Sequence, residues 1–469
     1  MTENHCDIAI IGGGPVGAAL ALALRGSNLK VCVLEARAEN TASQDARALA
    51  LSYGSRLLLD RLGVWNSLND VSPIRTIHIS QQKSFGRAVL RAAELNVPEL
   101  GYVLPYPALQ AALDKALSPN PSQPPLVRGG VVDSPHDKGE SEGVWFSNGL
   151  FGVKTIYSAK VTKLQGEASY ATISYQQGGE EKSLQTRLAV VADGGKLLAQ
   201  QHPPEVRDYG QSALITHITC AAPQPHKAFE RFTPHGPLAL LPFNPTPSVF
   251  TAKDEATKQK SPPPSFPPPQ GEGGQALLPS GEGLERGNVA IAKNNAGYEL
   301  VWTASHQTAQ AMLSWDDATF LRELQQQFGD RVGDFLTVSK RTCFPLGLRR
   351  ALQQTPQPHV VLLGNAAQTL HPVAGQGFNM GLRDAWELAE KILNVAPDAL
   401  GTEAMLNDYR KQRRTDREAG IRFTDGLVRL FSNDLPLVSA GRAAALTALD
   451  CLPFAKKFVA KRMMFGANG

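Results

Sequence analysis

The chain has 469 residues and a formal net charge of +4, so it is long enough for two or three domains and shows no strongly basic surface for nucleic acid. Its five cysteines are scattered without metal-ligand spacing, which is typical of a reduced, cytoplasmic protein with no structural metal. No basic signal-peptide region precedes the first apolar run, and no uninterrupted run of about 18 apolar residues predicts a membrane span.

The first predicted elements form one dinucleotide-binding unit. In chain order they are the strand Ile8–Ile11, the turn glycines Gly12, Gly14 and Gly17, the helix Ala18–Leu24, the strand Val31–Leu34 and Glu35. Gly12 permits a tight turn, Gly14 lets a pyrophosphate approach the backbone, and Gly17 lets the helix pack on the strand. The start of the helix offers N–H groups to phosphates, and Glu35 is placed to accept hydrogen bonds from a ribose.

Two low-complexity segments interrupt the chain, at residues 118–143 and 251–287. Both are rich in Pro, Gly and Ser, and neither can bury enough apolar surface to offset its ordering entropy. One interpretation is a polyproline ligand for a partner domain. We favour tolerated surface insertions in loops, the second of them in a hairpin loop between Phe243 and Tyr298.

The rest of the pattern predicts a mixed α/β chain. Predicted helices are Tyr106–Leu117, Trp315–Phe328 with Ser314 as its N-cap, Phe378–Leu393 and most of the chain after Leu406. Predicted strands are a meander over Gly152–Glu167, Ala168–Gln176 and Glu181–Val191, followed by Ala213–Cys220, Lys227–Thr233, Pro237–Phe243, Tyr298–Ala304 and His359–Leu363.

A second motif covers Val360–Asn379, where a buried strand leads into a Gly- and Pro-rich loop and then a helix. This order places backbone N–H groups and a helix N-terminus around a flat, electron-rich ligand.

With this motif the chain resembles the class A FAD-dependent aromatic hydroxylases, the para-hydroxybenzoate hydroxylase superfamily, and within it the ubiquinone-biosynthesis branch of 2-polyprenyl-6-methoxyphenol hydroxylases. The matching segments are the GxGxxG unit, Asp45–Leu51 (DARALAL), Val191–Gly194 (VADG), Ala228–Thr233 (AFERFT), His235–Ala239 (HGPLA), Gly364–Gln368 (GNAAQ) and His371–Asn379 (HPVAGQGFN).

The resemblance implies roles for the first three segments. The GxGxxG unit would hold the ADP half of FAD, with Glu35 on the adenosine ribose. Arg47 would contact the flavin side and accompany flavin movement, or it is a surface arginine at the start of a helix. Asp193 and Gly194 would contact FAD and a reduced nicotinamide, NADPH or NADH, or they form a strand-ending turn. The family continues with Ser and Arg where this chain has Gly195 and Lys196.

The resemblance also places the flavin end of the site in the second motif. Asn365 stands beside Gly364 where the superfamily generally has Asp, and it would still bind the ribityl hydroxyl groups. Pro372 would lie against the reactive face of the flavin, and His371 would be either a catalytic base or a structural turn residue. The cofactor-binding set would also include Gly375, Gln376, Gly377 and Asn379, whose backbone amides surround the pyrimidine end.

The implied fold is a Rossmann-like FAD-binding domain with an interleaved β-sheet substrate domain, α+β in character, and a helical C-terminus. The expected boundaries are 1–75, 101–196 and 336–395 for the FAD-binding domain, 76–100 and 197–335 for the substrate domain, and 396–469 for the helical region. Phe229–Thr233 and His235–Leu238 are the expected wall of the substrate site.

The implied activity is hydroxylation of a polyprenylated methoxyphenol in ubiquinone biosynthesis through a flavin C4a-hydroperoxide, with O2 and a reduced nicotinamide. Alternatives are hydroxylation at another ring position, a different flavoenzyme of this fold, or a flavin-loaded subunit without catalysis. The basic and apolar stretch from Tyr409 to Phe465 is either a helical cap or a contact with the inner membrane face or with a partner of a multi-enzyme complex.

Overall fold

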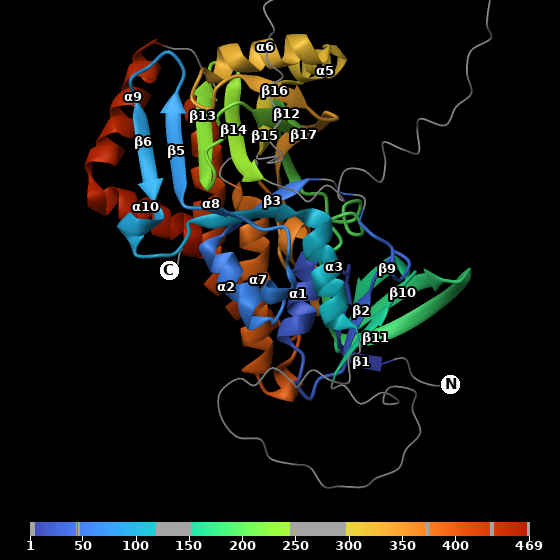
Figure 1. Cartoon of the computed structure of the whole chain (residues 1–469). Coiled ribbons are helices and arrows are strands. Elements are labelled where there is room, and N and C mark those ends of the chain that lie inside the picture. The colour runs from blue at the N-terminus through green and yellow to red at the C-terminus, as the bar shows by residue number, and fades with distance from the viewer. Residues whose placement is uncertain are drawn as a thin grey trace, which may run out of the picture.

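Three β-sheets and the helices between them organise this protein (Figure 1). The computed structural model describes residues 5–43, 45, 47–118, 152–243, 297–370, 375–431 and 436–466. The second predicted insertion, and the first beyond Ser118, lie outside the described residues. No helix among the described residues is both long enough and apolar enough to cross a membrane. The described residues also contain no group of three or more side chains placed to hold a metal ion.

The first sheet carries the dinucleotide-binding unit. Its path is β8 (Val153–Ile156), β2 (Val31–Leu34), β1 (His5–Ile11), β11 (Glu180–Val191), β10 (Ala171–Gln177) and β9 (Lys160–Gly166), with β18 (Val360–Leu362) also paired to β11. Strands β8, β2, β1, β11 and β18 are parallel, and β9, β10 and β11 form the antiparallel meander. The first predicted meander strand is therefore two strands, because the chain turns at Ser158 with φ of 55° and β8 joins β2 at the far edge.

Helices rich in small and apolar residues cover one face of this sheet. They are α1 (Pro15–Ala23), α3 (Tyr106–Leu117) and α7 (Gln376–Leu393), with α2 (Tyr53–Arg61) beside α7. All but one of the α1 residues are buried, so this helix is buried on every side as a Rossmann-type first helix must be.

The second sheet has nine strands and forms the upper part of Figure 1. Its path is β19 (Gln368–Thr369), β17 (Thr342–Arg350), β12 (Glu205–Cys220), β15 (Gly297–Ser305), β14 (Gly236–Phe243), β13 (Lys227–Thr233), β5 (Thr76–Gln81) and β6 (Arg87–Arg91), with β16 (Phe335–Val338) paired to β12. Strands β14 and β15 are antiparallel neighbours, so the second insertion connects the two strands of a hairpin, as predicted. Helices α5 (His306–Ser314) and α6 (Asp317–Phe328) pack on this sheet through an aromatic core.

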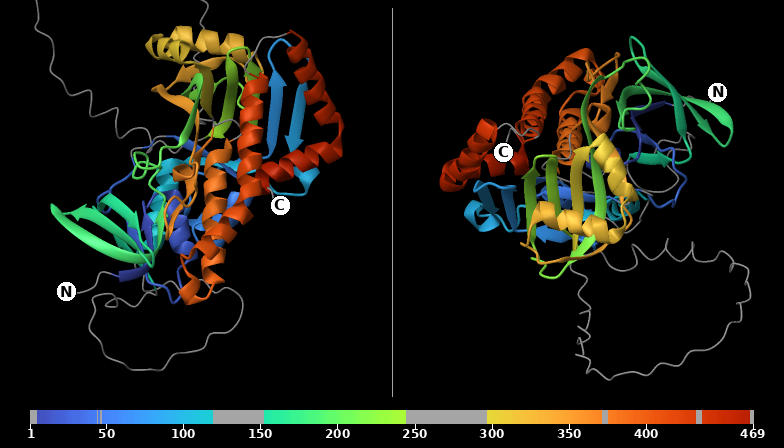
Figure 2. Two further views of the ribbon diagram at one scale, coloured as in Figure 1. Left: turned by 180° about the vertical axis from the view of Figure 1, so that it is seen from behind. Right: turned by 90° about the horizontal axis from the view of Figure 1, so that it is seen from above.

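A small third sheet and three C-terminal helices join the two larger sheets. The small sheet consists of β3 (Ala48–Ser52), β7 (Gly101–Pro105) and β4 (Ser72–Ile74). The helices are α8 (Glu403–Phe431), α9 (Pro436–Cys451) and α10 (Pro453–Phe465), and Figure 2 shows α9 and α10 beside β5 and β6. The predicted α/β class with an interleaved second sheet and a helical C-terminus is confirmed.

A buried ion cluster fixes α8 against α7. The Arg413 side chain is fully buried and binds Asp384 at 2.7 Å, Glu387 at 2.5 Å and Asp416 at 2.8 Å. A buried charge is tolerated only when it is paired in this way, and removal of one partner typically costs about 3–5 kcal/mol. The cluster therefore sets the position of α8 and of the helices that follow it.

Candidate active site

Two helix N-termini converge at the centre of the molecule. Helix α1 follows Gly14 and α7 follows Gly375, and neither helix has a side-chain hydrogen bond at its N-cap. The helices are in close contact, because a Cβ added to Gly381 of α7 would lie 3.0 Å from Cγ2 of Val16 in α1. Uncapped N-termini present free N–H groups and the positive end of the helix dipole. The pair therefore forms a site for a polar or anionic ligand.

The three glycines of the first motif have distinct structural roles. Gly12 has φ of 103°, and a Cβ on it would lie 2.7 Å from the Ala192 carbonyl oxygen. A Cβ on Gly17 would lie 2.0 Å from the Gly12 oxygen, so α1 packs directly on the turn. Gly14 differs, because the nearest atom to its added Cβ is the Tyr106 hydroxyl oxygen at 3.9 Å. Gly12 and Gly17 build the turn, whereas Gly14 borders open space in front of α1.

Glu35 lies at this turn and is held by hydrogen bonds. Its carboxylate accepts from the Gly13 N–H at 2.6 Å and from the Arg37 N–H at 2.8 Å. The Arg37 side chain pairs with Glu35 at 3.3 Å and with Asp114 of α3 at 3.3 Å. Gln110 of α3 donates to the Gly13 carbonyl oxygen at 2.9 Å. The pattern of the first motif gave no signal for the α3 residues, because contact with α3 arises only in the fold.

Asp193 closes the turn that follows β11. Its carboxylate accepts hydrogen bonds from the N–H groups of Gly195 at 2.8 Å, Lys196 at 3.1 Å and Leu197 at 2.7 Å. Gly194 has φ of 80°, and nothing lies within 4 Å of an added Cβ. The structure thus gives Asp193 the geometry of a strand-ending turn, with open space beside Gly194.

Arg47 precedes β3 and is half-exposed. It forms two hydrogen bonds with Asp45, at 2.8 Å and 2.5 Å, and its guanidinium lies 5.3 Å from the centre of the Phe344 ring on β17. The adjacent Ala48 N–H donates to the buried Glu299 carboxylate at 3.5 Å. Burial raises the pKa of Glu299 to about 7. Glu299 on β15 is a second titratable group beside this segment, and no local sequence pattern pointed to it.

The second motif surrounds the start of α7. Gly364 has φ of 58°, its added Cβ would lie 3.2 Å from Val16, and the side chain of Asn365 next to it is exposed. His371 and Pro372 lie outside the described residues. Thus Gly364 and Asn365 lie where β18 ends beside α1, at the same place as the two helix N-termini.

The first turn of α7 combines open backbone with buried amide side chains. Gly375 has φ of 60°, and Gly377 has nothing within 4 Å of an added Cβ. Gln376 is buried and donates to the Met463 carbonyl oxygen at 3.3 Å. This arrangement leaves the backbone at Gly377 accessible to a ligand.

The Asn379 side chain joins three elements. Its oxygen accepts from the Ser52 N–H at 2.8 Å and the Ser55 hydroxyl at 2.7 Å. Its nitrogen donates to the carbonyl oxygens of Ala50 at 3.0 Å and Gly375 at 2.6 Å. These four bonds use the donors and acceptors of the amide, so the side chain ties β3 and α2 to the start of α7.

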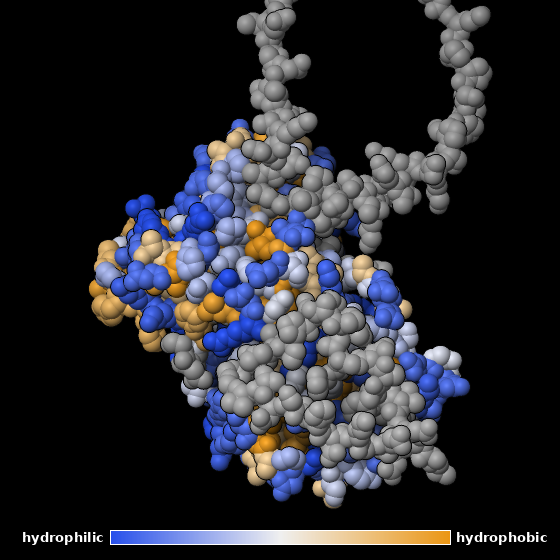
Figure 3. Space-filling view, turned by 60° about the horizontal axis from the view of Figure 1, so that its bottom comes forward, coloured by the Kyte–Doolittle hydropathy of each residue, from blue (hydrophilic) through white to orange (hydrophobic). Residues whose placement is uncertain are grey.

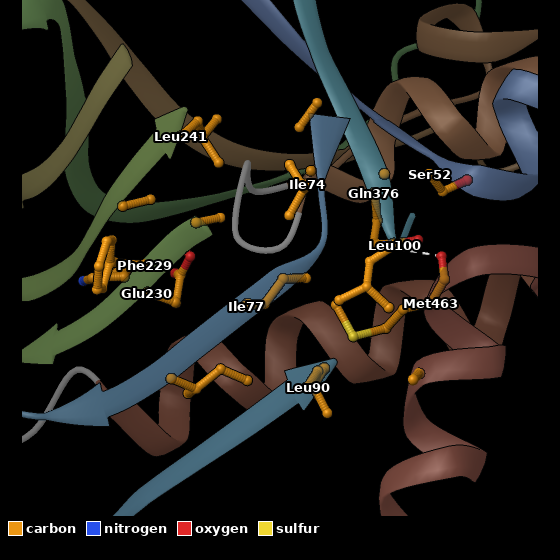
Figure 4. A pocket seen from close by; sticks show the side chains of 18 of the residues that line it. Ser52, Ile74, Ile77, Leu90, Leu100, Phe229, Glu230, Leu241, Gln376 and Met463 are labelled. Carbon is orange, nitrogen blue, oxygen red and sulfur yellow. Dashed lines mark hydrogen bonds between the residues drawn. The ribbon is translucent and has the colours of Figure 1, made fainter. Parts of the chain in front are cut away.

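A cavity of about 300 Å³ lies between the start of α7, the second sheet and the C-terminal helices. Figure 4 shows its lining, with Gln376 and Glu230 on opposite sides. Most of the lining is apolar, from Ile77, Ile79, Leu90, Phe232, Leu241 and Met463 among others. The cavity has the size and character of a site for an apolar small molecule.

Glu230 is the one side chain in the described lining that can ionise. It lies on β13, and burial raises its pKa to about 8. Glu230 and Phe232 line the cavity, as does the neighbouring Phe229, whereas Arg231 donates a hydrogen bond to the Gln327 carbonyl oxygen at 2.8 Å. His235 is exposed and does not belong to the lining, although Pro237 does.

The C-terminal helices form a wall of this cavity. Phe423 and Leu427 come from α8, Leu446 and Leu449 from α9, and Met463 from α10. The sequence indicated helices here, but the apolar residues that face the cavity were not identified, because their partner strands β5 and β6 precede them by more than 300 residues.

Comparisons with known proteins agree with this geometry. A family model described as FAD binding domain matches residues 5–124 and 151–424. A ubiquinone hydroxylase of Rhodospirillum rubrum is 27% identical over 475 residues, covering 98% of this chain and 90% of that protein. The 3-demethoxyubiquinol 3-hydroxylase of Escherichia coli is 27% identical over 462 residues, covering 96% of each chain. The fold is similar to p-nitrophenol 4-monooxygenase from Pseudomonas putida, with a TM-score of 0.65, 14% identity and 99% of both chains covered.

Proposed function

This chain belongs to the FAD binding domain family and is an FAD-dependent aromatic hydroxylase that uses NAD(P)H and O2, and on that premise we propose that it hydroxylates a polyprenylated methoxyphenol in ubiquinone biosynthesis. The observation that carries the choice of substrate is the apolar cavity that begins at α7. Because Glu230 is the one ionisable group in the described lining, the cavity suits an apolar phenol better than a charged hydroxybenzoate.

The glycine turn fits the diphosphate of FAD. The nearest atom to a Cβ added at Gly14 is 3.9 Å away, so open space lies in front of the uncapped start of α1. A pyrophosphate needs such a space to approach the backbone. In this proposal Gly12 and Gly17 shape the turn, and Glu35 exchanges its bond with the Gly13 N–H for the ribose hydroxyl groups. The ADP half would therefore lie along α1.

The flavin half would lie at the start of α7. We assign the ribityl chain to Gly364 and the exposed Asn365, and the pyrimidine end to the backbone amides of Gly375, Gln376 and Gly377. In this proposal the α7 dipole stabilises negative charge on the reduced ring. Asn379 holds the α7 start in place through its four hydrogen bonds and is a positioning residue.

Five further residues keep the roles that the resemblance gives them. Arg47 would approach the flavin from the β3 side, after exchange of its bonds with Asp45. Asp193 and Gly194 would border the cofactor through the turn after β11. Pro372 would face the reactive side of the flavin and His371 would be the nearby base, both in the loop before Gly375.

The substrate half of the site has to hold a ring and exclude water. Bound FAD, with O2 and a reduced nicotinamide, supplies the oxygen-activating chemistry. The side chains of Ile77, Leu90 and Met463 keep the cavity dry, which protects reactive oxygen from release as peroxide. Glu230 is protonated at neutral pH because its pKa is about 8, so it can donate a hydrogen bond to a ring oxygen and accept a phenol proton as the pH rises.

Product analysis tests this function. FAD-loaded protein is supplied with NADPH, NADH and O2, and with two phenols of matched ring pattern, one with a short prenyl tail and one without. The proposal predicts that the prenylated phenol is converted to a product heavier by one oxygen, and nuclear magnetic resonance then gives the ring position. Conversion of the phenol without a tail alone would refute the choice of substrate, and the absence of any substrate-dependent consumption of O2 would favour a subunit without catalysis.

We also propose that α10 contacts an anionic membrane surface at the inner face, where a polyprenylated substrate resides. Phe454 and Phe458 are 71% and 67% exposed, one helical turn apart, and Lys457 and Lys461 are exposed beside them. Figure 3 shows hydrophobic and hydrophilic surface side by side on the side of the molecule that carries α9 and α10. The combination of exposed rings with lysines matches an anionic lipid surface.

Vesicle co-sedimentation separates this contact from a contact with a partner enzyme. A Phe454→Ser, Phe458→Ser double variant should lose binding to vesicles that contain phosphatidylglycerol, whereas an exposed-residue control, Phe85→Ser, should retain it. Equal binding by both variants would refute the membrane contact and leave the face for a partner of a multi-enzyme complex.

A further inference from the structure

A second cavity, of about 500 Å³, lies on the other side of the strands that wall the apolar cavity. Side chains alternate along a strand, so β13, β5 and β6 turn Glu230, Ile77 and Leu90 toward the apolar cavity and the residues between them to the opposite face. The proposed reaction uses no side chain of that opposite face. Phe229 is the one described residue that lines both cavities.

Basic residues from four elements meet in this second cavity. The strand pairing aligns Lys227 of β13 with Thr76 of β5, and Thr76 with Arg91 of β6. The next row across the strands is Phe229, His78 and Val89, which gives the floor an apolar centre. The described lining consists of Thr76, His78, Arg87, Val89, Arg91, Gln224, Lys227, Phe229, Arg331 and Asp450. We call it the basic cavity.

Few carboxylates neutralise these cations. Arg91 pairs with Glu94 at 2.8 Å, and Asp450 is occupied by the Val89 N–H at 3.0 Å and the Lys456 ammonium at 3.0 Å. By contrast, Arg87, Lys227 and Arg331 form no ion pair with any carboxylate in the described part of the chain. Among the residues that the structure describes, the Lys227 ammonium contacts the Gln224 side-chain oxygen at 2.9 Å and the Phe229 ring, 5.0 Å from its centre.

His78 lies in the floor of the basic cavity, and its pKa is lowered in part by the excess positive charge there. Its Nδ1 atom is buried and has no hydrogen-bond partner among the described residues. Burial first, and then the charges of Arg331, Lys227 and Arg87, lower the pKa of His78 to about 4. Burial and the charges of Arg91 and Arg331 also lower the pKa of Lys227. Like charges that are held this close oppose one another unless an anion joins them.

We propose that the basic cavity binds a phosphate group. A phosphate carries about two negative charges and three acceptor oxygens at neutral pH, and arginine forks match its geometry. The Arg87, Lys227 and Arg331 side chains supply unpaired charges, and the Phe229 and Val89 side chains offer an apolar floor to whatever the phosphate is attached to. The group belongs either to a soluble phosphate ester or to a phospholipid headgroup.

Binding of two probes to the FAD-loaded protein tests this site. Inorganic pyrophosphate is titrated by calorimetry, while the His78 ring signals are followed by nuclear magnetic resonance. In a parallel arm, co-sedimentation is measured with vesicles that contain phosphatidic acid and with vesicles of neutral lipid alone. Saturable pyrophosphate binding with a shift of the His78 signals identifies a soluble phosphate source, whereas binding only to the phosphatidic acid vesicles identifies a headgroup.

An Arg87→Gln, Lys227→Gln double variant should bind at least about tenfold more weakly to whichever probe the unmodified protein binds, because it loses hydrogen bonds between charged groups. The matched control Lys163→Gln removes an exposed lysine from β9 in the other sheet and should change the affinity by less than about twofold. The same loss in both variants, or no saturable binding of either probe to the unmodified protein, would overturn the proposal. Neither result bears on the hydroxylase reaction.

Discussion

Replacement of Glu230 by glutamine tests most directly whether the apolar cavity surrounds this carboxyl group with an environment of low polarity. Burial raises the Glu230 pKa from 4.5 to about 8, so the folded protein holds a proton that the unfolded chain releases between those two pH values. The stability contributed by this proton is fully present below pH 4.5 and is lost as the pH rises through 8. Glutamine has the same shape and cannot ionise, so Glu230→Gln should remove this part of the pH dependence.

The magnitude follows from the pKa difference. At about 1.36 kcal/mol per pKa unit, a carboxyl group sealed from water would lose about 5 kcal/mol across the range. The Glu230 residue is only partly buried, so we expect about 2–3 kcal/mol between pH 5 and pH 8. The unmodified protein and Glu230→Gln should have similar stability at pH 5, and the variant should be the more stable by that amount at pH 8.

Urea unfolding of the FAD-loaded proteins at pH 5, 6, 7 and 8 measures this difference, and infrared spectra follow the protonated carboxyl group directly. The matched control is Glu205→Gln, since Glu205 is exposed at the start of β12. If the curves of the unmodified protein and Glu230→Gln run parallel from pH 5 to pH 8, or if the infrared band titrates near pH 4.5, Glu230 is solvated as in water and the reasoning about the cavity fails.

Four further substitutions test the proposed cofactor site, the scaffold and the proposed substrate wall separately. Gly14→Val should fold and lose FAD absorbance, because the new side chain fills the open space before α1, whereas Gly17→Val should fail to fold because its Cβ would lie 2.0 Å from the Gly12 oxygen; a yellow Gly14→Val protein would contradict this. Asn379→Leu should lower the free energy of unfolding by about 2–4 kcal/mol, as expected when buried donors and acceptors lose their partner, and an unchanged urea midpoint would contradict it. Leu90→Trp should fill the cavity and raise KM for a prenylated phenol at least tenfold with FAD still bound, which steady-state kinetics and flavin absorbance would check together.

The strand–turn–helix unit at the N-terminus was predictable because its signals are local. The strand, the glycine turn and the acid at Glu35 follow one another within 30 residues, and each has a fixed structural consequence. The same holds for α3, whose observed bounds, Tyr106–Leu117, equal the predicted ones. Signals of this kind need no knowledge of distant contacts.

Where two local signals compete, the prediction failed. Ser314 was expected to cap a helix from Trp315, but Asp316 accepts the Thr319 N–H at 2.7 Å and starts α6 at Asp317. Ser314 instead ends α5, a separate helix capped by Ser305. Serine and aspartate are both strong N-caps, so the choice between them depends on how the two helices pack on the second sheet.

The apolar cavity could not be predicted, because its walls come from distant parts of the chain. Glu230 reads as an ordinary strand glutamate, and it faces an apolar cavity only because β13, β5, β6 and the C-terminal helices meet in the fold. The basic cavity has the same origin, since Lys227 and Arg91 meet only through the parallel pairing of β13 with β5.

A crystal structure of the FAD-loaded protein with a short-chain prenylated methoxyphenol tests the central claim most directly. The account predicts one flavin whose diphosphate lies at Gly14 and whose ring lies at Gly375–Gly377, with the phenol beside it and the prenyl tail along Ile77 and Leu90. A flavin bound elsewhere, or a phenol outside the cavity between α7 and β13, would contradict it.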